Sequence, residues 1–155
     1  MSSAATDTLP PAQFVCPRCE SLVRVPAARL KDDPKCPRCH AALFEGRPLV
    51  LTDGNFDRHV SATSVPLVVD FWAPWCGPCR SMAPVFEQAA ATMEPAVRFG
   101  KLDTDASPQV ASRFGIRSIP TLIVFKDGRE IAQQARTMNP ANLQQWIDQA
   151  ISDDR

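Results

Sequence analysis

All six cysteines of this 155-residue chain occur in pairs with two residues between them. The pairs are Cys16/Cys19, Cys36/Cys39 and Cys76/Cys79, so no cysteine is left over. Thiols at this spacing either bind a metal ion or exchange disulfides. The sequence around each pair predicts which of these two chemistries it supports.

Cys76 and Cys79 follow a nearly continuous apolar run, Leu67–Trp72, and open a segment with helical spacing of apolar residues. A thiol in the first turn of a helix faces unpaired backbone N–H groups and the positive end of the helix dipole, which favour the thiolate. We therefore predict Cys76 as an exposed nucleophile that attacks a disulfide, and Cys79 as the thiol that resolves the mixed disulfide. Pro78 is compatible with this first turn, because its missing N–H would have no partner there. This context disfavours a metal-binding knuckle or two inert core thiols.

The other four cysteines form two Cys-Pro-Arg-Cys motifs separated by sixteen residues. This spacing is typical of a zinc site, and a closed shell of four thiolates indicates a structural rather than a catalytic ion. The surrounding segment has little apolar surface, and domains below about 40 residues usually need a metal or disulfides. We predict one structural zinc ion, bound by Cys16, Cys19, Cys36 and Cys39.

Three alternatives remain open for these cysteines. They could form two disulfides under oxidation. His40 could replace one of them as a ligand, since imidazole is also a good zinc donor. The sequence from Cys36 to His40 also matches a haem-attachment pattern, which would require export and would leave Cys16 and Cys19 without a role.

Sequence pattern divides the chain into three segments. We predict a disordered segment at 1–13, a zinc-ribbon-like module at 14–46 and an α/β domain at 47–155. In the module, short strands are expected at 21–25 and 41–44. In the domain, strands are expected at 67–72, 97–102 and 121–125, with a turn at 126–128 leading into a fourth. Helices are expected at about 52–60, 79–93, 107–115 and 139–151.

The charges of the chain balance, with seventeen Lys and Arg against seventeen Asp and Glu. This balance gives no preference for nucleic acid or for a membrane surface. Segment 14–46 is more basic, which fits a solvated surface or a weak site for an acidic partner, and it lacks the aromatic residues that stack on single strands. Because residues 1–13 lack the features of a secretory signal and no run could span a membrane, we expect a cytoplasmic monomer.

Two segments of the domain resemble the signature sequences of thioredoxin. They are Val69-Asp-Phe-Trp-Ala-Pro-Trp-Cys-Gly-Pro-Cys79 and Phe114-Gly-Ile-Arg-Ser-Ile-Pro-Thr121. The resemblance extends from about Leu49 to Ile151, and with its four-cysteine module the chain is most similar to the zinc-binding second thioredoxin of bacteria. It implies the thioredoxin fold, a central mixed sheet with helices on both faces. It also implies reduction of oxidised cytosolic proteins without a bound organic cofactor, and recycling by an NADPH-dependent thioredoxin reductase.

The resemblance further assigns roles to individual residues. Asp70 matches a buried aspartate that exchanges protons with the resolving cysteine, and Lys101 matches the lysine that faces it. A carboxyl group in an apolar strand should have a raised pKa, although a hydrogen-bonded Asp70 and a solvent-facing Lys101 are the simpler alternatives. Ile119-Pro120 matches the cis-proline of the family. The implied substrate-binding residues are Trp75, Gly77, Pro78, Ile119 and Pro120.

One position departs from the family pattern. Arg136 occupies the place where the family usually has glycine next to the substrate groove.

Several functions are compatible with the motifs. A protein-disulfide reductase is the first hypothesis. A zinc-dependent redox sensor or holdase is the second, because zinc loss would unfold the module. A disulfide oxidant or isomerase is disfavoured by the Gly-Pro dipeptide between Cys76 and Cys79.

Overall fold

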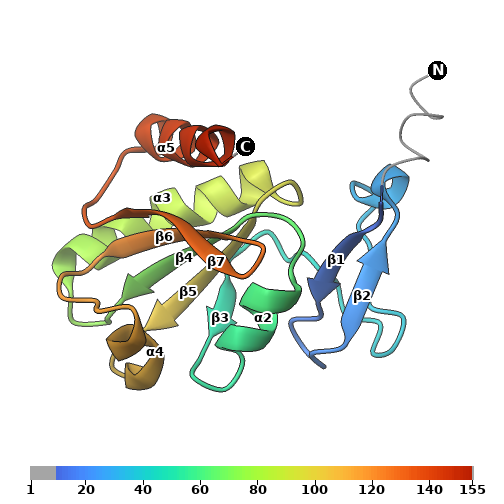
Figure 1. Cartoon of the computed structure of the whole chain (residues 1–155), viewed down its shortest axis with the longest axis horizontal. Coiled ribbons are helices and arrows are strands. Elements are labelled where there is room, and N and C mark those ends of the chain that lie inside the picture. Colours follow the sequence, from blue (N-terminus) through green and yellow to red (C-terminus); the bar gives the residue numbers. More distant parts are fainter. Residues whose placement is uncertain (1–9, 155) are drawn as a thin grey trace.

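The computed structural model describes residues 10–154, which form two separate β-sheets and the helices around them (Figure 1). The elements of the amino-terminal part are β1 (Ala12–Val15), β2 (Leu22–Val25) and a short 3-10 helix (Ala27–Arg29). The remaining elements are β3 (Leu49–Leu51), α2 (Phe56–Ala62), β4 (Leu67–Trp72), α3 (Gly77–Met93), β5 (Arg98–Asp103), α4 (Pro108–Arg113), β6 (Thr121–Lys126), β7 (Arg129–Gln134) and α5 (Pro140–Asp153). None of the helices between residues 10 and 154 has the length and apolar character needed to cross a bilayer.

The larger sheet has five strands in the order β3-β5-β4-β6-β7. Strands β3 and β4 both run parallel to β5, whereas β6 pairs with β4 and β7 in antiparallel fashion. The sheet is therefore mixed, which confirms the predicted sheet type. The carboxyl ends of β4 and β5 meet at one edge, where Trp72 pairs with Asp103.

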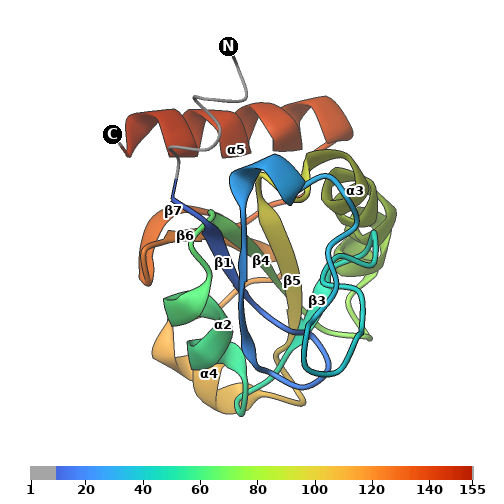
Figure 2. The same cartoon turned by 90° about the vertical axis from the view of Figure 1, so that its right-hand side faces the viewer.

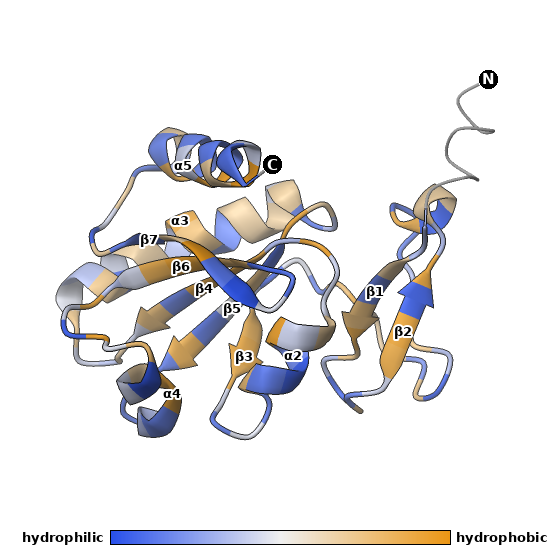
Figure 3. Cartoon of the chain, in the orientation of Figure 1, coloured by the Kyte–Doolittle hydropathy of each residue, from blue (hydrophilic) through white to orange (hydrophobic). Residues whose placement is uncertain are grey.

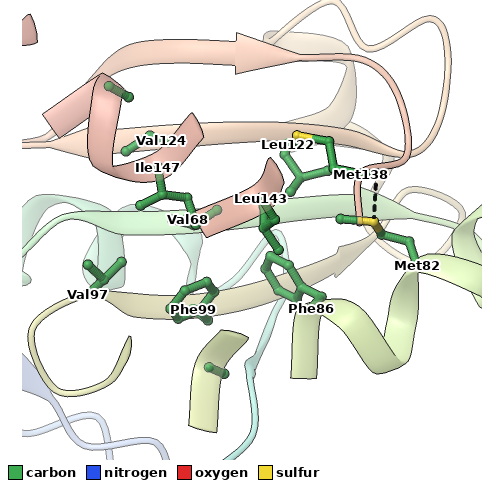
Figure 4. Close-up of a cluster of buried hydrophobic side chains, with 12 residues drawn as sticks. Val68, Met82, Phe86, Val97, Phe99, Leu122, Val124, Met138, Leu143 and Ile147 are labelled. Atoms are coloured by element: carbon green, nitrogen blue, oxygen red, sulfur yellow. Dashed lines mark hydrogen bonds between the residues drawn. The ribbon is translucent and has the colours of Figure 1, made fainter. Parts of the chain in front are cut away.

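Helices cover both faces of this sheet (Figure 2). Successive side chains of a strand point to opposite faces. Val68 of β4 accordingly joins a core with residues of α3 and α5, such as Phe86 and Leu143 (Figure 4). Phe71 joins a second core on the α2 and α4 side. Because both faces of β4 are covered, its sequence is apolar almost throughout, and Figure 3 shows hydrophobic residues concentrated on the central strands.

The amino-terminal module, residues 10–46, lies beside α2 (Figures 1 and 2). Strands β1 and β2 are antiparallel, and Phe14, Val23 and Leu43 form a small core with two of the cysteines. The module contacts the segments just before β4 and β5. Ser64 donates its N–H to the carbonyl oxygen of Gln13 over 2.9 Å, and Val65 packs against the small core.

The module and the Cys76/Cys79 pair therefore lie at opposite ends of the strands. The module contacts residues that precede β4, and the dithiol follows the last residue of β4, Trp72. A strand of six residues spans about 20 Å at a rise of about 3.3 Å per residue. The module consequently does not line the redox centre.

The structure corrects several predictions at the level of elements. Residues 41–44 do not form a strand, and only Ala42 makes an isolated bridge, to Lys35. Strand β1 begins at Ala12, inside the segment predicted to be disordered; residues 1–9 lie outside the described part of the chain. Strand β3 was not predicted, because a strand of three residues is too short for an alternation of apolar and polar side chains to be recognised. Helix α2 begins at Phe56 rather than near residue 52, because the chain first makes a turn over residues 52–55.

Candidate active site and metal centre

Cys76 and Cys79 form a disulfide at the start of α3. Cys76 is the N-cap residue of the helix, and the backbone N–H of Cys79 donates to the Cys76 sulfur over 3.2 Å. The first N–H groups of a helix have no partner inside it, so one of them is free to bind this sulfur. The same hydrogen bond and the helix dipole stabilise a negative charge on Cys76 when the disulfide is reduced.

Both cysteine residues of the disulfide are largely covered. Cys76 is 5% exposed and Cys79 is 1% exposed. The predicted exposure of Cys76 is therefore wrong for the disulfide form, because Cys76 packs in a small cluster with Ala73, Trp72 and Ile119. The roles of Cys76 as the attacking thiol and Cys79 as the resolving thiol stay predictions.

The segment that begins β6 lies against this disulfide. The Ile119–Pro120 peptide bond is cis, as the family resemblance implies. The carbonyl oxygen of Ile119 is 3.7 Å from the Cys76 sulfur, and the Thr121 hydroxyl donates to the carbonyl oxygen of Ser118. Residues 43 positions apart in the sequence thus form one site.

The surface around Cys76 is formed by exposed residues of the signature motif. Trp75 is 67% exposed, and Gly77 and Pro78 are exposed as well. The indole N–H of Trp75 donates to Asp105 over 2.7 Å. Sequence reasoning did not identify Asp105, because no local pattern connects it to Trp75. Arg136 is exposed in the connection between β7 and α5.

Asp70 is fully buried in β4, and within residues 10–154 neither of its carboxylate oxygens has a hydrogen-bond partner. Burial raises the pKa of Asp70 to about 7, while the charge of Lys101 lowers it. The simpler alternative of a hydrogen-bonded aspartate is therefore wrong. Lys101 is opposite Asp70 in the register of β4 and β5, and it is half-buried, with its Nζ 4.3 Å from the centre of the Trp72 ring. Asp70 is thus placed to gain or lose a proton near neutral pH.

The four amino-terminal cysteines converge on one point. Their sulfur atoms all lie within 4.8 Å of one another, and the closest pairs, Cys16/Cys39 and Cys19/Cys36, are 3.5 and 3.6 Å apart. Four sulfurs at the usual Zn–S distance of about 2.3 Å around a tetrahedral ion are about 3.8 Å apart. The donor set and its spacing therefore fit a zinc ion without further movement of the backbone.

The two Cys-Pro-Arg-Cys motifs have the same backbone conformation. The N–H of Glu20 donates to the carbonyl oxygen of Cys16 over 3.0 Å, and that of His40 donates to Cys36 over 2.8 Å. Glu20 and His40 both have positive φ, which turns the chain back after the second cysteine. Because His40 is exposed and does not belong to the sulfur cluster, this structure does not support it as a ligand. All four cysteines are free, which also argues against the two-disulfide alternative.

Comparison with known proteins agrees with these two sites. The thioredoxin family model matches residues 47–149, and a second family, described as "Thioredoxin 2, N-terminal", matches residues 15–41. Thioredoxin C-3 of Corynebacterium nephridii is 41% identical over 138 residues, which are 89% of this chain and 94% of that protein. Thioredoxin 1 of a Nostoc strain is 44% identical over 65% of this chain and 94% of its own length. With a disulfide at the start of α3 and a four-cysteine cluster in the matched module, this chain belongs to the thioredoxin family and is a thioredoxin-type disulfide oxidoreductase with an N-terminal zinc-ribbon module.

Proposed function

We propose that the chain is a cytoplasmic protein-disulfide reductase that acts through Cys76 and Cys79 and is recycled by thioredoxin reductase at the expense of NADPH. The observation that carries this proposal is the disulfide at the start of α3, with one sulfur bound by a helix amide and the buried Asp70 on the adjacent strand. These features supply a stabilised thiolate, a resolving thiol and a proton acceptor.

In the first step, the reduced Cys76 thiolate attacks one sulfur of a substrate disulfide. A bond forms between Cys76 and that sulfur, and the other substrate sulfur leaves as a thiolate that takes a proton from solvent. The amide of Cys79 stabilises the attacking thiolate before the reaction, because it donates to the same sulfur.

In the second step, Cys79 loses its proton and attacks the Cys76 sulfur. The substrate leaves as its second thiolate, so the substrate gains two electrons and the protein is left with the Cys76–Cys79 disulfide. We assign Asp70 as the group that accepts the Cys79 proton, since a carboxyl group with a pKa of about 7 can accept and return a proton at neutral pH. Lys101 tunes Asp70, because its positive charge favours the carboxylate.

We further propose that substrates bind across the surface around Cys76. Trp75, Gly77 and Pro78 are exposed on one side of the disulfide, and the Ile119–Pro120 segment lies on the other. The chain carries no pattern for nucleic acid or membrane binding, and it needs no second copy to complete the site. Its expected partners are therefore thioredoxin reductase and extended segments of oxidised proteins.

A coupled assay tests the proposal directly. Full-length protein, thioredoxin reductase and NADPH should reduce insulin, with NADPH consumption proportional to the concentration of this chain. If the chain catalyses insulin reduction with dithiothreitol but not with thioredoxin reductase and NADPH, the proposed recycling partner is refuted and the dithiol chemistry is not. Failure with both reductants would refute the reductase function.

We propose that the four-cysteine site binds one structural zinc ion that is released when its thiolates are oxidised. Protein purified without oxygen should contain about one zinc per chain, and hydrogen peroxide should release it to a colorimetric chelator. A variant with both Cys76→Ser and Cys79→Ser should bind and release zinc equally well, because those residues lie at the other end of the sheet. Iron in the site, or protein without metal, would contradict the assignment.

A further inference from the structure

A buried ion pair lies at the start of β5, remote from the dithiol. The side chains of Arg98 and Glu94 are 3% and 4% exposed, and their closest charged atoms are 3.7 Å apart. Glu94 also accepts the N–H of Phe99 over 3.2 Å, but its second oxygen has no partner in the described part of the chain. Glu94 alone therefore does not supply all the interactions that a buried guanidinium needs, since such a group carries several donors and a full charge.

The amino-terminal module supplies the rest of the surroundings of Arg98. The Arg98 guanidinium carbon is 4.6 Å from the centre of the Phe44 ring, and Phe44 in turn packs edge-on against Phe14 at 4.9 Å. Burial lowers the pKa of Arg98, while the charges of Glu94, Glu45 and Cys16 raise it, in that order. An arginine of the catalytic domain thus lies against an aromatic ring of the four-cysteine module and near the charges of Glu45 and Cys16.

Other contacts between the module and the catalytic domain also orient the module, but these contacts involve no buried charged group. Gln13 exchanges hydrogen bonds with Ser64 and donates its side-chain amide to the carbonyl oxygen of Ala62 over 2.9 Å. Arg58 donates to the carbonyl oxygen of Glu20 over 2.8 Å, from an exposed position. Removing one of these bonds leaves groups that water can reach, whereas removing the module would uncover the buried Arg98 and take away the Phe44 ring that packs on it.

We propose that Arg98 couples zinc binding in the module to docking of the module on the catalytic domain. Phe44 links the two sites, because it packs on the Arg98 guanidinium and against the small core that contains Cys16 and Cys36. A zinc ion with four thiolates carries about two negative charges, which favour a nearby cation such as Arg98. Zinc binding and docking then stabilise each other, and by linkage each affects the other by the same factor. This inference rests on the proposed zinc site.

The test is the zinc affinity of the full-length reduced protein, measured by competition with a chelator. Arg98→Met should weaken zinc binding by roughly 5- to 150-fold, the usual range for coupling between two sites. Arg98→Lys should recover only part of this loss, because lysine keeps the charge but not the planar group that stacks on Phe44. Arg129→Met removes an arginine that pairs with Asp154 away from the module, and it should leave the affinity unchanged.

A milder variant and a second readout guard against general unfolding. Phe44→Leu keeps an apolar side chain, and it should weaken zinc binding in the same direction with near-native circular dichroism. In the wild type, zinc removal should speed hydrogen exchange at the amide of Phe99, next to Arg98, and at that of Ser64, which donates to Gln13 of the module, but not at Ile147 in α5. Stoichiometric zinc with unchanged affinity in Arg98→Met would overturn the coupling alone. A wild-type protein that binds no zinc would overturn the metal site, and the coupling with it.

Discussion

Cys76→Ser is expected to reduce turnover in the reductase-coupled insulin assay by about three orders of magnitude or more, the scale on which loss of a nucleophile affects an enzyme. The serine hydroxyl cannot replace the sulfur, because only a thiolate attacks a disulfide at neutral pH. The fold should persist, since Cys76 caps α3 and serine is a good capping residue. Initial rates of NADPH oxidation at equal protein concentrations give the measurement.

Two further variants make this result specific. Cys79→Ser should retain the attack but lose the resolving step, so that mixed disulfides with substrate accumulate on Cys76 and appear as adducts on non-reducing gels. Ser81→Ala, an exposed change in the same helix, should leave the rate unchanged. A wild-type rate for Cys76→Ser would contradict the assignment of Cys76 as the nucleophile. Adducts on Cys76→Ser instead of Cys79→Ser would reverse the assignment of the two sulfurs.

Asp70→Ala is expected to stabilise the protein at pH 8 relative to wild type, on the order of 4 kcal/mol less the effect of the small cavity. The pKa of Asp70 is raised from 3.8 to about 7, chiefly by burial. Well below pH 4 the carboxyl group is protonated in the folded and unfolded states alike, so its ionisation makes no contribution to stability there. As the pH rises to 7, the unfolded state loses this proton first, so wild-type stability falls and stays lower above pH 7.

Urea unfolding of both proteins at pH 4 and pH 8 measures this effect. The informative quantity is the difference in unfolding free energy between variant and wild type at each pH, because any loss of zinc at low pH then affects both proteins. The advantage of Asp70→Ala should be present at pH 8 and absent at pH 4. Lys101→Met should move the wild-type transition to higher pH, since it removes the charge that lowers the pKa of Asp70. An equal difference at both pH values would contradict a raised pKa.

The position of the module changes how zinc can influence the redox centre. Because the four-cysteine cluster and the dithiol lie at opposite ends of β4 and β5, the cluster cannot contact a substrate held only at Cys76. Any effect of zinc on reduction must pass through the parts of the catalytic domain that the module contacts, which are α2 and the segments around the starts of β4 and β5. Arg98, the first residue of β5, lies against the Phe44 ring of the module.

Both reactive sites were predictable from the sequence because their chemistry is local. The Cys76/Cys79 pair lies within one helical turn, and each pair of the four-cysteine cluster lies within one backbone turn, so spacing and the neighbouring residues together indicated what the sulfurs could do. The long strands were equally accessible, since Leu67–Trp72 is covered on both faces and is apolar almost throughout.

The tertiary structure decided the features that depend on residues distant in the sequence. The register of β4 and β5 places Lys101 opposite Asp70, and folding brings Asp105 to Trp75 and Phe44 to Arg98. No local pattern encodes such pairs, because strand register and domain packing follow from the summed burial of many side chains rather than from any short motif. For the same reason the sequence showed that this chain has two sulfur sites but could not show that the length of a strand separates them.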